Sequence, residues 1–233
     1  MNYLQICQRL AFESGTVQSK TLPASVTGQT ALRLLHVIDD AATAYNDIQN
    51  LHSNWRWLEG EFTGTLSAST ARYTASGSFS LTRFAEWIHD SPRKRIMSIY
   101  KVSLGVSDEG VLTFMPWDLW RETYDRGTQT DDRPTHWTIS PANEFCVGPA
   151  PDVAYTLKGL YRKGPQTLAA DSDEPEMPSR FHNMIWRKGL MLMHARDESF
   201  FQLGNNENLF LQDLEELQRD QLPRVGIKFS PVA

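Results

Sequence analysis

The acidic segment from Asp171 to Glu176 is the part of the sequence that comes closest to a metal-binding motif. Asp171 and Asp173 have the spacing of the first two ligands of an EF-hand calcium loop. Such a loop continues with oxygen ligands, places Gly at its sixth position and ends on Glu at its twelfth. Here the fifth, sixth and twelfth positions are Pro175, Glu176 and His182. The pattern fails, so we expect a solvated turn that also caps the following helix electrostatically, with a looser cation site as the alternative.

The other residue types that support catalysis are not arranged for it. Adjacent carboxylates such as Asp39-Asp40 and Glu215-Glu216 diverge by about 100° around a helix, so they do not converge as a general acid and base. The six histidines are scattered without ligand spacing. The sequence has no Gly-rich phosphate loop, His-Glu-x-x-His motif, Cys-x-x-Cys pair or Gly-x-Ser-x-Gly elbow. We therefore predict no enzymatic activity, no metal and no cofactor.

The two cysteines, Cys7 and Cys146, both lie among apolar neighbours. Two cysteines exclude a disulfide scaffold and are typical of a protein made in a reducing cytosol. Neither lies in a context that suggests a nucleophile, so we expect both to be buried thiols.

The tryptophans are unusually numerous and could stack on sugars or nucleobases if they were exposed. The seven are Trp55, Trp57, Trp87, Trp117, Trp120, Trp137 and Trp186. Packing in a core or a subunit interface is the simpler interpretation, because tryptophan is enriched at interface hot spots. The one small basic cluster, Arg93-Lys94-Arg95, is interpreted as a charged turn rather than a DNA contact.

The bulk composition is that of a globular protein. The chain has 233 residues, 40% of them hydrophobic and 22% charged, and its formal net charge is −5. That charge argues against broad non-specific binding to nucleic acid, although DNA could slide past an acidic wall. No segment approaches the roughly 18 apolar residues of a membrane span, and the first residues lack the order of a secretion signal. We expect a protein that is made and used without crossing a membrane by that route.

Helical spacing marks both ends of the chain. A first helix is predicted within Tyr3 to Glu13, and a long amphipathic helix from about Thr27 to Leu58, with Thr27 as its N-cap. Its apolar stripe is Ala31, Leu34, Ile38, Ala41, Tyr45, Ile48 and Leu51. After Pro178 one helix is marked by Phe181, Ile185, Leu192 and Ala195. Another runs roughly from Asn206 to Gln221, with Leu209, Phe210, Leu214 and Leu217 as its stripe, and Pro223 ends it.

The middle of the chain has the alternation and turn residues of strands. Short strands and turns are predicted within Glu61 to Thr82, and a short helix from Pro116 to Tyr124. Further strands are predicted at Arg95–Ser103, Gly110–Phe114, Thr135–Ser140, Glu144–Val147 and Val153–Arg162. The last alternates most cleanly, with Tyr155, Leu157, Gly159 and Tyr161 on one face.

This order predicts an α+β fold, because the terminal helices cannot bury their apolar stripes alone. The N- and C-terminal helices would form a helical bundle with an inserted antiparallel β-rich domain. The predicted boundaries are 1–58 and 169–222 for the two parts of the bundle, 59–168 for the inserted domain with a short helix near 117–124, and 223–233 for an extended tail.

Several segments, in order along most of the chain, resemble the adaptor (head-to-tail connector) proteins of tailed phages. The resemblance begins with the opening Met1 to Leu10 and continues with Ser25 to Thr30, which leads into a helix ending in Asp47 to Trp57. The further matching segments are Trp117 to Arg121, Gly148 to Asp152 and Asp171 to His182.

The resemblance implies a structural virion protein, made in the host bacterial cytoplasm. Copies would form a ring, normally a dodecamer, docked beneath the portal protein and added after genome packaging. The ring would extend the DNA channel, letting genomic DNA pass without sequence-specific binding, and would carry tail or stopper and nozzle proteins. By analogy, the C-terminal tail would insert into the portal through Leu222, Val225, Ile227 and Phe229.

Three alternatives remain at this point. The chain could be another virion connector or tail protein. It could instead be a carbohydrate- or receptor-binding module of a tail or surface protein, which predicts tryptophans exposed in a groove on one face. An unrecognised enzyme would need a cleft with convergent carboxylates.

Overall fold

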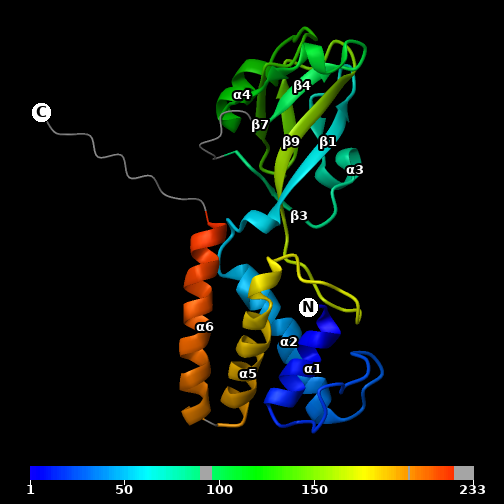
Figure 1. Cartoon of the computed structure of the whole chain (residues 1–233). Helices are drawn as coiled ribbons and strands as arrows, with labels where there is room; N and C mark the ends of the chain where they lie inside the picture. The colour runs from blue at the N-terminus through cyan, green and yellow to red at the C-terminus, as the bar shows by residue number, and fades with distance from the viewer. Residues whose placement is uncertain (90–95, 199, 223–233) are drawn as a thin grey trace, which may run out of the picture. The chain divides into compact units, whose positions relative to one another are not determined.

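The computed structural model of the chain describes residues 1–89, 96–198 and 200–222 (Figure 1). Within these residues it contains six α-helices and nine strands. The chain divides into a helical unit, Met1–Leu58 with Pro165–Ala233, and a strand unit, Glu59–Gly164. The α+β class predicted from the sequence is confirmed. No helix in the described part of the chain has both the length and the apolar character to span a bilayer.

Four α-helices form the helical unit. They are α1 (Tyr3–Glu13), α2 (Leu32–Asn50), α5 (Asn183–Arg196) and α6 (Phe200–Gln221), together with the 3-10 turns η1 (Arg56–Leu58) and η3 (Ser179–Phe181). Helix α5 contacts α1, α2 and α6 (Figure 1). Helix α1 starts with a capping box, in which the Asn2 side chain accepts from the Gln5 N–H and the Gln5 side chain accepts from the Asn2 N–H.

Helix α2 is shorter than the predicted 27–58 helix at both ends. Thr27 is not its N-cap, because the hydroxyl of Thr27 bonds locally with Ser25 and the next residue, Gly28, has a φ of +71°. The helix starts only after Ala31. At the other end the Trp55 indole N–H donates to the Ile48 carbonyl at 3.1 Å and so satisfies a group of the last turn. The ends of the predicted stripe, Ala31 and Leu51, are accordingly exposed.

The buried residues of the C-terminal helices differ from the predicted apolar stripes, because neighbouring helices cover other residues. Three helices surround α5, and its buried residues are Met184, Ile185, Gly189, Leu190 and Met193. The predicted stripe is therefore wrong at its end, since Leu192 is half-buried and Ala195 exposed. Helix α6 starts at Phe200, earlier than the predicted Asn206. It buries Phe210 and Leu217 as predicted, whereas Leu209 is exposed.

Two sheets make up the strand unit. The first has the order β1 (Glu59–Leu66), β9 (Tyr155–Lys163), β4 (Ser98–Lys101), β5 (Gly110–Val111), and β3 (Phe84–Trp87) also pairs with β9. The second has the order β2 (Arg72–Tyr73), β8 (Phe145–Gly148), β7 (His136–Ile139), β6 (Thr113–Phe114). The pairs are antiparallel except β6 and β7, which are parallel, so the prediction of an antiparallel domain is correct only in the main.

An aromatic core lies between the two sheets. Strand β9 buries the predicted face, Tyr155, Leu157, Gly159 and Tyr161, toward this core. The side chains of Phe62, Phe79, Trp87 and Phe145 meet there with ring centroids 5.3–6.1 Å apart. The sheet that contains β1, β9 and β4 has its core on this side, so its other face is the outer face of the strand unit.

Two helices accompany the sheets. Helix α4 (Trp117–Tyr124) occurs where a short helix was predicted. Helix α3 (Ala75–Phe79) was not predicted, and neither was β3. Thr74 caps α3 by accepting from the Gly77 N–H, which explains how a Ser- and Gly-rich segment can form one helical turn.

Candidate functional site

In the acidic segment that resembles a calcium loop, the carboxylates of Asp171 and Asp173 accept hydrogen bonds from the backbone. Asp171 accepts the Val26 N–H at 2.6 Å, and the Asp173 carboxylate accepts the N–H groups of Ala169 and Ala170 at 2.7 and 2.8 Å. Those two N–H groups lower the pKa of Asp173. The backbone carbonyl of Asp173 also accepts the N–H of Tyr3 at 2.7 Å. The segment therefore braces the first turn of α1, which comes earlier in the chain, whereas a cap on the following helix was expected.

The groups that could act as nucleophiles, bases or metal ligands are separate and internally bonded. In the described part of the chain no three His, Cys, Asp or Glu side chains come together as a metal site. Burial raises the pKa of both Cys7 and Cys146 to about 12, so neither thiol is a nucleophile at neutral pH. The buried His182 places Nε2 3.0 Å from the Met177 carbonyl and Nδ1 2.8 Å from the amino group of Met1.

The tryptophans pack inside the two units. All seven lie in the described residues; Trp55, Trp87, Trp120 and Trp137 are buried, and Trp57, Trp117 and Trp186 are half-buried. Trp117 and Trp120 stack on each other with centroids 5.3 Å apart, and Arg72 lies over both rings. None of these seven rings forms an exposed platform, which favours packing over the sugar- or receptor-binding alternative.

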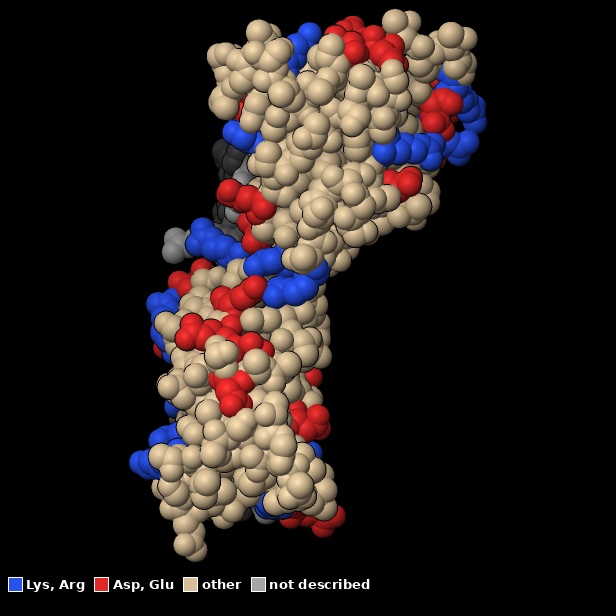
Figure 2. Space-filling view, turned by 90° about the vertical axis from the view of Figure 1, so that its right-hand side faces the viewer, with Lys and Arg blue, Asp and Glu red and all other residues tan. Residues whose placement is uncertain are grey.

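Charge is mixed over the visible surface. Figure 2 shows Lys and Arg interspersed with Asp and Glu on this face of each unit, without one continuous basic field. The net charge of −5 agrees with this distribution. Broad electrostatic binding of DNA needs clustered Lys and Arg. The predicted basic turn Arg93-Lys94-Arg95 lies outside the described residues.

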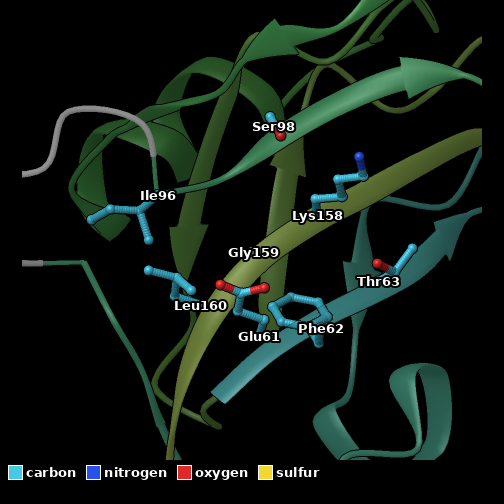
Figure 3. A pocket seen from close by; sticks show the side chains of 8 residues that line it. All are labelled: Glu61, Phe62, Thr63, Ile96, Ser98, Lys158, Gly159 and Leu160. Atoms are coloured by element: carbon cyan, nitrogen blue, oxygen red, sulfur yellow. The ribbon is translucent and has the colours of Figure 1, made fainter. Parts of the chain in front are cut away.

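One shallow groove on the outer face of the strand unit could receive a ligand (Figure 3). Its volume is about 500 Å³, and its lining comes from β1, β9, β4 and the residue before Met97: Glu61, Phe62, Thr63, Ile96, Ser98, Lys158, Gly159 and Leu160. Ile96 and Leu160 lie toward one end, and Lys158 and Thr63 toward the other (Figure 3). Glu61, Thr63, Ser98 and Lys158 make this lining largely polar, and it contains no nucleophile–base pair that would support catalysis.

A second feature of the strand unit is an apolar loop between β4 and β5, which we call the tip loop (residues 102–106). Its side chains Val102, Leu104 and Val106 are 55, 59 and 57% exposed. The N–H of Val102 donates to the Ala154 carbonyl at 3.2 Å, so Val153, itself exposed, lies beside the loop. Exposed apolar residues are ordinary on a protein surface, and these three are gathered in one short loop.

A polar network holds the tip loop in place. The carboxylate of Asp108, in the 3-10 turn η2 (Gly105–Asp108), accepts the Lys101 N–H at 2.9 Å and Arg133 Nη1 at 2.8 Å. Arg133 Nη2 donates to the Asp108 carbonyl at 2.6 Å. The Lys101 N–H, then the Arg133 side chain, lower the pKa of Asp108. A loop held in this way loses little conformational freedom on binding.

A second carboxylate anchors the neighbouring loop before β9. Asp152 accepts the Tyr155 hydroxyl at 2.6 Å and lies 3.5 Å from the Lys101 ammonium. The Tyr155 hydroxyl is the main reason why the pKa of Asp152 is lowered. The tip loop and the loop before β9 are thus both fixed to the sheet.

Of the predicted portal-binding residues, only Leu222 lies in the described part of the chain. It is half-buried against the helical core, and its N–H donates to the Gln218 carbonyl at 2.9 Å. Val225, Ile227 and Phe229 lie outside the described residues. The tip loop and the groove were not predicted. The sequence feature that could have indicated the tip loop was the apolar alternation Val102, Leu104, Val106. It continues through turn residues beyond the predicted 95–103 strand.

A family model described as SU10 adaptor protein matches residues 1–230, which is nearly the whole chain. No curated protein matches the sequence.

Proposed function

The chain belongs to the SU10 adaptor protein family, a phage head-tail adaptor family, and from this premise we propose that its copies form a ring between the portal and the tail. The family match over residues 1–230 is the observation that carries the proposal. The protein is a structural phage adaptor by family, and the ring would extend the channel through which the genome leaves the head.

A ring of identical copies would bind the portal more tightly than a single copy. One copy docked on a portal would be held weakly, but symmetric copies on a symmetric partner gain affinity through effective concentration. The net charge of −5 would let the polyanionic genome slide through the channel without sequence-specific binding. The family is one of structural adaptors, so we expect a protein that works without enzymatic activity or a cofactor.

Within the ring, we assign the helical unit to a bundle that carries the strand unit as an insertion. The helices α1 and α2 from the start of the chain pack on α5 from its end, and α5 in turn packs on α6, which supports this assignment. The C-terminal segment after α6 would dock on the portal through Leu222, Val225, Ile227 and Phe229. Three of these alternate with Gly226 and Lys228, so an extended segment would present them on one face.

The test is electron microscopy of the protein alone and mixed with DNA-filled, tailless capsids of its phage. We expect additional ring-shaped density at the portal vertex of the mixed particles. Capsids that stay unchanged at saturating protein, with the protein decorating cells or glycans instead, would contradict the adaptor function and favour the receptor-binding alternative.

A further inference from the structure

We draw no further inference here: the strongest candidate, the tip loop of the strand unit with Val102, Leu104 and Val106 more than half exposed, is an apolar surface patch, and nothing in the structure shows what covers it.

Discussion

At the scale of single residues, the helical unit contains one carboxylate that depends on its partner. Asp40, on α2, is only 2% exposed. Arg196, in the last turn of α5, holds it with two hydrogen bonds of 2.6 and 2.8 Å. A buried charge without its partner keeps the full cost of desolvation, so this pair connects the two helices more strictly than an exposed ion pair does.

The first prediction concerns this pair. Arg196→Met should lower the free energy of unfolding by about 3 kcal/mol or more, because it leaves Asp40 buried and unpaired. Arg33→Met removes the partner of the exposed Asp197 nearby and should cost only about 0–1 kcal/mol. Urea denaturation of both variants measures the difference, and equal losses would contradict the assignment.

The second prediction concerns the pH dependence of stability. Burial is the main cause that lowers the pKa of His182 below its ordinary value of 6.5. The unfolded chain therefore binds this proton first, and as the pH falls below 6.5 protonation shifts the equilibrium toward unfolding. Above that value the neutral ring contributes no such penalty.

Thermal melts of the natural chain and of His182→Gln between about pH 8 and pH 5 measure this effect. We expect the melting temperature of the natural chain to fall more steeply toward acid than that of the variant, whatever their difference at pH 8. Asp108, Asp152 and Asp173 have lowered pKa values, so their contributions are lost at still lower pH. Parallel curves for the two proteins would contradict the role of His182.

At the scale of elements, glycines allow strands to lie close to aromatic side chains. A Cβ added at Gly64 of β1 would collide with Phe79 Cδ1, which belongs to α3. Likewise, a Cβ added at Gly148 of β8 would collide with the ring of Tyr124 of α4. The two short helices of the strand unit thus pack where the sheets offer no side chain.

The third prediction follows from the first of these contacts. Gly64→Ala should destabilise the protein by about 1–3 kcal/mol, because the methyl group overpacks a core that cannot easily move Phe79. At Gly164, just beyond β9, the nearest atom to an added Cβ is 3.4 Å away. Gly164→Ala should therefore have a small effect, and chemical denaturation of the two variants compares them. Two similar, small effects would show that α3 yields to the methyl group.

At the scale of the whole molecule, the proposed ring needs a contact with the portal, which we assign to the segment after the helical unit. This contact does not require the chain to change its fold, so it can be removed separately.

The fourth prediction uses this separation. A chain ending at Leu222 lacks the last three of the proposed portal-binding residues, Val225, Ile227 and Phe229. It should keep the circular dichroism spectrum of the full chain, because the helical core described above does not include those residues, and it should fail to bind tailless capsids. Capsid binding as tight as that of the full chain would show that the portal contact lies elsewhere.

The regular elements and the family could be read from the sequence. The periodicity of α1, α4 and β9 reflects one buried face each, and the ordered segments from Met1 to His182 indicated the adaptor family. Local periodicity does not report how many neighbours an element has. The stripes of α5 and α6 were wrong in part because three helices surround α5, and α2 ended early because Trp55 bonds to Ile48.

The candidate site was decided by the tertiary structure alone. Val102, Leu104 and Val106 alternate in the sequence in the same way as Tyr155, Leu157 and Tyr161. The structure makes a strand of the second segment, whereas residues 102–106 form a turn and the start of the 3-10 turn η2. The second sheet covers the face of Tyr155 and Leu157, whereas the side chains of the tip loop remain exposed. Alternation determines which side chains share a face only where the segment forms a strand, and the packing of distant segments decides whether that face becomes core or surface.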